Sequence, residues 1–479
     1  MSSSESETSA GESDADRIRR NDKSLTRVEL DDWGDAVEIL DALKNNSVVK
    51  KVSIFLETDN LLEVSEEAFL KLFEVMKSNK SVESLTFYIL GRGGVRRESL
   101  FANIASSGGW SSIQELIFDS EEINGFGSLS LREAEHISSF ILQSRNLSTL
   151  KLENTGVESA PIVETLSRTN IQSLQIRVNE ECTLQNGGRR IAAALERCTG
   201  ITELELGCSS YYSDQVELFR ILLVESIPKM LGLKKFELEI SRHSDQQLFD
   251  MVGQCIGGHQ GVIEELRLTY HIASVNSSLA GLAPALRRLK VVRFDGNAPL
   301  TLQEMSELSG IAADFDFLEE FGCNLVFLSK QMPTEDFKAI CQLLSKFPSL
   351  KRLTRDSWMS IYAGDLLDLS EESRFMAFLE MIKTSKTIEQ VPPFQSCHNA
   401  EEEASIRHHC HNNMMRNRFE VFQEDLLAAT VPSSAWPLIL HEFSDRPDVL
   451  YCLLQQKHSA MIGPTLHGCK RKQDFDEGV

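Results

Sequence analysis

Apolar residues recur along this chain in a six-residue phrase, L-x-x-L-x-L, in which other apolar residues can replace leucine. The phrase returns about every 30 residues, which is typical of stacked supersecondary units. Its clearest copies are Val49-Val52-Ile54, Val82-Leu85-Phe87, Ile113-Leu116-Phe118, Leu147-Leu150-Leu152, Ile171-Leu174-Ile176, Ile201-Leu204-Leu206, Leu233-Phe236-Leu238, Ile263-Leu266-Leu268, Leu286-Leu289-Val291 and Leu318-Phe321-Cys323. With shorter copies at 25–30, 350–353 and 388–391, they predict a solenoid of about 12 units over residues 25–393.

The segments between the phrases have the period of a helix. Apolar residues there follow the spacing i, i+3, i+4, i+7, as at 36–43, 68–76 and 337–344. Ser130 and Glu133 have the spacing of a capping box, which predicts a helix start. Parallel strands joined by crossover helices wind right-handed. We therefore expect an α/β fold, a right-handed horseshoe with a parallel sheet on its concave face and helices on its convex face. The short intervals 147–171 and 263–286 should hold short helices.

The two ends of the chain depart from this pattern. Residues 1–24 are rich in serine and acidic residues, which predicts a disordered tail. After residue 393 the phrase stops, while apolar clusters at 419–427, 436–440 and 449–454 favour helices. Because an open solenoid end must be covered, residues 394–469 are interpreted as an α-helical C-terminal cap. Residues 470–479 are expected to form a flexible tail.

These phrases resemble the leucine-rich repeat superfamily over residues 25–393, and the unit length resembles its ribonuclease-inhibitor-like class. The family phrase continues to an asparagine three places after its last leucine, and among the full copies only Asn179 conforms. The resemblance therefore comes without an asparagine ladder. Members of the family mostly bind other proteins. The resemblance thus implies a non-catalytic protein–protein interaction scaffold with an unidentified protein partner.

Within each phrase, the residues between the apolar ones should face the concave side. Their charges alternate in sign along the C-terminal half, as Lys234-Lys235, Glu264-Glu265, Arg287-Arg288, Glu319-Glu320, Lys351-Arg352 and then Glu389. This pattern predicts ion pairs that link Lys235 to Glu265, Glu265 to Arg288, Arg288 to Glu320, and Glu320 to Arg352. Two interpretations stay open: a structural ion-pair ladder, or a bipolar stripe that binds a charged partner.

The N-terminal half places Phe55, Tyr88 and Ile117 at outward positions among smaller polar residues. Exposed aromatic side chains on such a face are candidate contact anchors, unless a tail or loop covers them. The candidate partner-binding set is therefore Phe55, Tyr88, Ile117, Lys235, Glu265, Arg288, Glu320 and Arg352.

Composition narrows the class of partner and the compartment. The net charge of −22 argues against nucleic acid as a partner. The richest apolar run, 218–233, is interrupted by charges, so no membrane helix is expected, and residues 1–5 lack the features of a secretory signal. Ten cysteines without a C-x-x-C pair favour free thiols in a reducing compartment. We therefore expect a cytoplasmic or nuclear protein.

Two motifs could carry chemistry. Cys397-His398 with residues 408–411 could bind zinc, but their spacing fits no known finger, and the other interpretation is a polar edge of the cap. We predict no metal, no cofactor and no enzyme activity. The glycine-rich segment with Arg92, Arg96 and Arg97 resembles the arginine-bearing loops of Ran GTPase-activating proteins. The alternative function is thus regulatory, as a GTPase activator or as a substrate-recognition subunit of a ubiquitin ligase.

Overall fold

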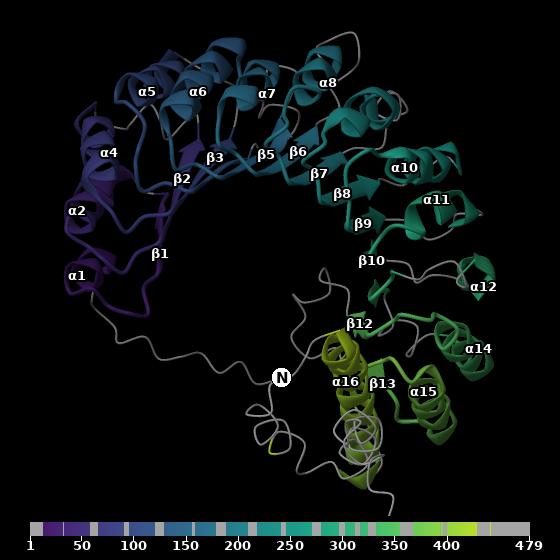
Figure 1. The fold of residues 1–479 in the computed structure, drawn as a ribbon. Helices are drawn as coiled ribbons and strands as arrows, with labels where there is room; N and C mark the ends of the chain where they lie inside the picture. The colour runs from purple at the N-terminus through teal and green to yellow at the C-terminus, as the bar shows by residue number, and fades with distance from the viewer. Residues whose placement is uncertain are drawn as a thin grey trace, which may run out of the picture.

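The computed structural model describes residues 13–31, 33–57, 66–90, 95–119, 129–155, 159–178, 188–208, 218–240, 246–270, 279–296, 302–311, 317–323, 332–354, 367–392, 394–395, 400–428 and 441. Over these residues the chain forms an open horseshoe, with strands on the inside and helices on the outside (Figure 1). This arrangement confirms the predicted α/β solenoid.

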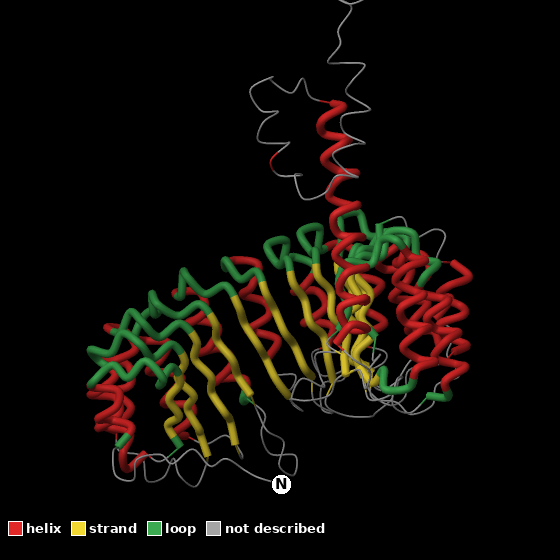
Figure 2. The backbone as a smooth tube through the Cα atoms, turned by 90° about the horizontal axis from the view of Figure 1, so that it is seen from below, coloured by secondary structure: helices red, strands yellow, loops and turns green. Residues whose placement is uncertain are grey.

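Twelve parallel strands of the described chain form one sheet, and their order in the sheet is their order in the sequence. They are β1 (Arg27–Leu30), β2 (Lys51–Glu57), β3 (Ser84–Leu90), β4 (Glu115–Asp119), β5 (Thr149–Thr155), β6 (Ser173–Val178), β7 (Glu203–Cys208), β8 (Lys235–Ile240), β9 (Glu265–Tyr270), β10 (Val291–Gly296), β11 (Glu320–Gly322) and β12 (Arg352–Thr354). Figure 2 shows these strands side by side along the inner surface. Each unit therefore adds one strand beside its predecessor.

Helices cover the outer side of the sheet, and the last of them lies at its C-terminal end (Figure 1). They are α1 (Asp14–Arg19), α2 (Trp33–Leu43), α4 (Glu66–Ser78), α5 (Val95–Ser106), α6 (Leu131–Gln143), α7 (Ala160–Thr165), α8 (Arg189–Leu195), α10 (Gln246–Gly258), α11 (Ala283–Leu286), α12 (Leu302–Ile311), α14 (Thr334–Leu344), α15 (Glu372–Ser385) and α16 (Ala400–Ala428). Short helical turns are η2 (Leu166–Arg168), η4 (Leu222–Ser226), η5 (Ile227–Lys229) and η6 (Leu279–Leu282). As predicted, the helices of the intervals 147–171 and 263–286, α7 and α11, are short.

The apolar residues of the phrases form the core between sheet and helices. Leu152, Leu206 and Leu268 lie on β5, β7 and β9 and are 0%, 2% and 0% exposed. Full burial of such a side chain contributes about 1.5–3 kcal/mol. The repeated phrase is therefore the main source of cohesion between neighbouring units. The capping box of α6 is also present, because Ser130 Oγ accepts from Glu133 N and Glu133 Oε2 accepts from Ser130 N.

The tenth phrase lies three residues later than the sequence predicts. Val292, not Leu289, pairs with Leu266 of β9 and with Phe321 of β11. The phrase is therefore Leu289-Val292-Phe294, all of it buried. Leu286 ends helix α11 and is also buried, which is why its spacing imitated the start of a phrase.

Polar side chains at the turns before the strands bind carbonyl groups of the preceding unit. Their contacts are Asn46 Nδ2 to Ile18 O (2.7 Å), Asn79 Nδ2 to Leu43 O (2.6 Å), Ser226 Oγ to Ala192 O (2.9 Å) and His259 Nε2 to Ile227 O (3.1 Å). Because His259 Nδ1 accepts from Gly261 N, its Nε2 carries the proton in this bond. These side chains hydrogen-bond carbonyl groups near helix ends. They therefore satisfy backbone groups at turns, as the asparagines of a ladder would.

The two ends of the described chain are closed by helices. Residues 14–19, which the sequence assigned to a disordered tail, instead form α1, and its Ala15 and Ile18 are buried. At the other end, Asn413 of α16 donates to Ile382 O and Ile388 O (3.2 and 3.0 Å). Ile406 on the same helix is fully buried. The first part of the predicted cap is thus helical. A separate two-stranded sheet precedes this helix and consists of β13 (Leu367–Asp368) and β14 (Phe394–Gln395).

Candidate functional site on the concave face

The concave face brings side chains from many units together. In each strand, residues alternate between the core and the concave side, so the strand register fixes which side chains are neighbours. Gln175 of β6 pairs with Glu205 of β7, which pairs with Glu237 of β8, which pairs with Arg267 of β9. The middle of the sheet is therefore a row of ionisable and amide side chains.

Arg177 is the centre of the densest cluster on this face. Its guanidinium lies 3.4 Å from Glu153, 3.1 Å from Glu205 and 3.0 Å from Glu239, measured between nitrogen and carboxylate oxygen. These three carboxylates come from β5, β7 and β8, so one arginine links four neighbouring strands. Gln175 Nε2 donates to both Glu153 (2.7 Å) and Glu205 (2.8 Å). The cluster holds its carboxylates in fixed positions.

Glycine at position 207 lets Arg177 reach across β7. A Cβ atom there would lie 2.9 Å from Glu239 Oε2 and 3.0 Å from Arg177 Cγ. Real Cβ atoms almost never approach other atoms so closely, so any larger residue would displace this ion pair. Gly322 lies in a similar way beside Arg293, because a Cβ atom on Gly322 would lie 3.0 Å from Arg293 Cγ.

The cluster carries more negative charge than its arginines compensate. The pKa of Glu153 is raised to about 7, chiefly by burial. The nearby carboxylates of Glu205, Asp119 and Glu239 also raise it, while Arg177 lowers it. A carboxyl group that titrates near neutral pH marks a place where further negative charge is unfavourable. A positive charge from outside would stabilise this site.

The C-terminal part of the face carries the predicted alternation of charges, with one correction. Lys235 Nζ lies 3.9 Å from Glu265 Oε1, and Arg352 Nε lies 2.8 Å from Glu320 Oε2, as predicted. Arg288 does not lie in the sheet, so its two predicted pairs are wrong. Arg293 takes that place, at 3.9 Å from Glu265 and 2.7 Å from Glu320.

Arg288 instead caps the C-terminal end of α10. Its Nη1 donates to the carbonyl oxygens of Ile256, Gly257 and His259, and its Nη2 donates to Gly261 O, at 2.7–3.2 Å. A cation at this end also interacts favourably with the helix dipole. Arg288 is therefore a structural residue of the helix-to-strand turn, not part of the concave surface.

The N-terminal part of the face is aromatic. Phe55 of β2 and Tyr88 of β3 are register partners, and their rings stack with centroids 4.5 Å apart and an interplanar angle of 15°. Both rings and the nearby Ile117 of β4 are partly exposed. The structure thus brings the three predicted anchors to one side of one sheet.

The basic segment of the alternative hypothesis is only partly a loop. Helix α5 begins at Val95, and Arg97 is buried within it, with Nε 2.6 Å from Glu133 Oε1 and Nη2 3.1 Å from Oε2. Both side chains are 1% exposed. An arginine held in this way cannot be presented to a GTPase, so Arg97 is excluded as such a residue. Arg92 and the side chain of Arg96 lie outside the described residues.

The cysteine and histidine motif is also changed by the structure. Cys397 and His398 lie outside the described residues, whereas residues 408–411 lie on helix α16 of the predicted cap. No group of three or more metal-ligating side chains occurs among the described residues. Burial raises the pKa of the Cys410 thiol to about 11, which disfavours the thiolate that a metal requires.

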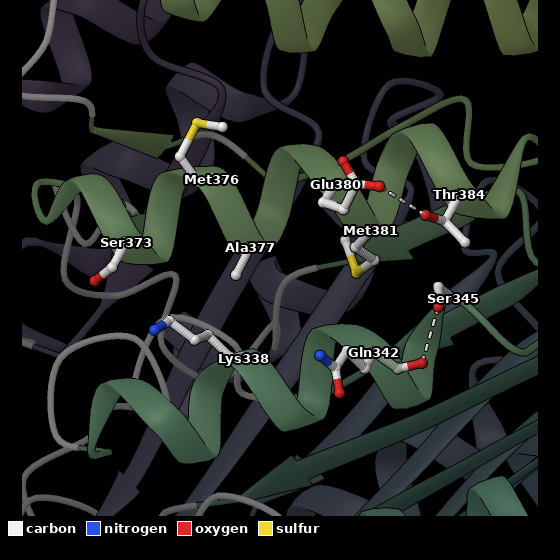
Figure 3. A pocket seen from close by; sticks show the side chains of 9 residues that line it. All are labelled: Lys338, Gln342, Ser345, Ser373, Met376, Ala377, Glu380, Met381 and Thr384. Carbon is white, nitrogen blue, oxygen red and sulfur yellow. Dashed lines mark hydrogen bonds between the residues drawn. The ribbon is translucent and has the colours of Figure 1, made fainter.

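A cavity of about 450 Å³ lies on the outer side, between α14 and α15 (Figure 3). Lys338 and Gln342 line it from α14, while Met376, Glu380 and Met381 line it from α15. No sequence motif indicates this cavity, because its lining residues come from two units.

Comparisons with known proteins give little guidance. No family model and no curated protein matches this chain. Among solved structures, 54 chains match, and one is "Leiomodin-1 Actin-Binding Site 2 (ABS2)", at 14% identity over 43% of this chain and 84% of that one. Its TM-score of 0.16 is too low to support any argument about fold or function. In the described residues, no helix is long and apolar enough to cross a membrane.

Proposed function

We propose that this protein is a non-catalytic scaffold that binds a partner protein through the concave face of its solenoid. In its repeated phrase and unit length, the solenoid resembles the ribonuclease-inhibitor-like class of leucine-rich repeats. That resemblance supports the proposal, because such arrays present side chains from many units to one partner. We further propose that the protein is cytoplasmic or nuclear. We do not expect it to bind nucleic acid or a membrane.

One observation carries the proposal. Helices α1 to α15 lie on the outer side of the sheet (Figures 1 and 2). Many concave side chains, including Tyr88, Gln175 and Arg177, stay partly exposed although they form an ordered network. Arg177, for example, keeps 28% of its side chain exposed while it contacts three carboxylates. Preorganised side chains of this kind lose little conformational entropy when a partner binds.

Site-specific photo-crosslinking in cells that express the full chain would test this proposal. A photoreactive amino acid would replace Gln175 or Tyr88 on the concave face, and Glu135 on α6 or Glu225 in η4 as matched outer positions. We expect the two concave positions to capture the same protein and the two outer positions not to capture it. The captured protein, once purified, should bind the wild-type chain. Capture by the outer positions alone would contradict the proposal.

A further inference from the structure

The charges of the central strands indicate which partner the concave face would bind. Every charged residue of β4–β9 lies at a concave position. The carboxylates are Glu115, Asp119, Glu153, Glu203, Glu205, Glu237, Glu239 and Glu265, and the cations are Lys151, Arg177, Lys235 and Arg267. Eight carboxylates face four cations, so this region carries an excess of negative charge. Negative potential on a concave surface attracts and orients positively charged partners.

A hydroxyl group beside the cluster lacks a hydrogen-bond partner among the described residues. Thr269 of β9 pairs in register with Glu239 of β8, and its strand position points it to the same side as Glu265 and Arg267. Thr269 is 2% exposed, yet no described residue forms a hydrogen bond with its Oγ1. An unsatisfied buried hydroxyl costs about 1–3 kcal/mol, and an N–H group of a bound partner would satisfy it. This is independent of the charge excess and points to a ligand with a hydrogen-bonding group, which the N–H donors of a basic side chain would supply.

The aromatic pair lies at a defined distance from the acidic centre. Four strand intervals separate β3, which carries Tyr88, from β7, which carries Glu205. At about 4.8 Å per interval, the separation is about 19 Å. An extended peptide spans that distance with about six residues. A segment with an apolar side chain at one end and basic side chains about six residues away would reach both places.

We propose that the concave face binds a basic segment of a partner protein whose lysine and arginine side chains contact the carboxylates around Arg177 and Thr269, and whose apolar anchor packs on Phe55 and Tyr88. This inference rests on the proposed function and adds the chemical class of the partner. Guanidinium and ammonium groups supply both the charge and the N–H donors that the site calls for.

Fluorescence anisotropy with synthetic peptides and the full chain would test this inference. The first probe joins Trp-Leu to Arg-Lys-Arg-Lys through a Gly-Ser spacer that places the two parts about six residues apart. The second replaces Trp-Leu by Gly-Ser, and the third replaces the basic residues by glutamate. We expect the first probe to bind at least fivefold more tightly than the second, and the third not to bind.

Charge-matched variants locate the binding. The double variant Glu205→Gln with Glu237→Gln should weaken binding of the first probe at least tenfold. The double variant Glu135→Gln with Glu225→Gln on the outer side should change the affinity for this probe less than twofold. Glu203→Gln, at an exposed concave position, gives a second variant if the first pair perturbs folding, and should weaken binding two- to threefold. Tyr88→Ala should lower the affinity for the first probe to that for the second. Thr269→Val should weaken the binding of both probes.

Equal binding of the acidic probe would overturn the inference, since the charge of the peptide would then not decide binding. Equal weakening by the inner and outer pairs would also overturn it, since attraction of basic peptides by the overall charge of −22 would then suffice. If crosslinking at Gln175 captures a partner but the basic probes fail, the inference is wrong while the proposed function stands. If concave crosslinking fails and the probes bind as expected, the surface binds basic peptides but the scaffold proposal fails.

Discussion

The central and C-terminal parts of the concave face use the same residue types in different proportions. In the C-terminal part, Glu320 is bound on both sides by arginine, and the adjoining row alternates Lys290, Glu319 and Lys351. In the central part, Arg177 alone contacts three carboxylates. Balanced alternation satisfies the sheet itself, whereas an excess of one sign leaves capacity for a partner. We therefore propose that the structural ladder describes the C-terminal part and that the central part is the binding surface.

The strongest test of the structural ladder is removal of its central carboxylate. Glu320 is 6% exposed and accepts from Arg293 (2.7 and 2.9 Å) and Arg352 (2.8 Å). Glu320→Ala leaves two arginines without their shared partner. Because these arginines are 30% and 41% exposed, we expect a loss of about 2–4 kcal/mol in the free energy of unfolding, below the value for a fully buried pair. Urea denaturation followed by circular dichroism would measure it. Glu203→Ala, at an exposed central position, is the control and should cost about 0.5 kcal/mol or less.

The excess charge of the central cluster predicts a specific dependence on pH. The pKa of Glu153 is about 7 when folded and 4.5 for the unperturbed group. Because the folded state favours the protonated form, this contribution to stability is complete below about pH 4.5 and is lost as the pH rises through 7. The change amounts to about 3 kcal/mol at most.

Glu153→Gln should remove this dependence, because the amide does not titrate. Unfolding experiments between pH 4.5 and 8 should show a shallower fall in stability for the variant than for the wild type. Thr86→Ala, on the same face without a titrating group, should keep the wild-type slope. A variant slope equal to that of the wild type would show that Glu153 does not feel the charge excess.

Substitution of Gly207 should have a smaller effect on stability, and this effect should be confined to the central part of the concave face. Gly207→Ala places a Cβ atom about 3 Å from Glu239 and Arg177, and both side chains would have to shift. We expect a loss of about 1–2 kcal/mol. Gly200→Ala is a matched control, because its Cβ atom would meet only Ile171 O, at 3.9 Å. If both substitutions cost the same, the passage of Arg177 across β7 is not a tight fit.

The sequence predicted the periodic features better than the long-range ones. The apolar phrase located the strands, because burial on one side of a sheet enforces a period of two. The Arg177 cluster was missed in the central strands, although Glu153, Arg177, Gly207 and Glu239 each lie one place beyond the last apolar residue of their phrase, as Phe55 and Tyr88 do. Extending the alternation by one residue would have found them. The place of Arg97 could not be predicted in this way, since its partner Glu133 lies in the next unit.

The exposed row of the ladder should contribute least, which separates it from the buried row beside it. Lys351 Nζ lies 3.0 Å from Glu319 Oε1, but the two side chains are 36% and 39% exposed. Water and salt screen such a pair, so Lys351→Ala should cost about 0–1 kcal/mol, and the cost should vanish in 1 M NaCl. Arg352→Ala, on the neighbouring residue, should cost more at both salt concentrations, because its partner Glu320 is buried. Equal losses in the free energy of unfolding for the two variants would mean that burial does not distinguish the two rows. The alternating charges of the C-terminal part would then be as available to a charged partner as the central cluster.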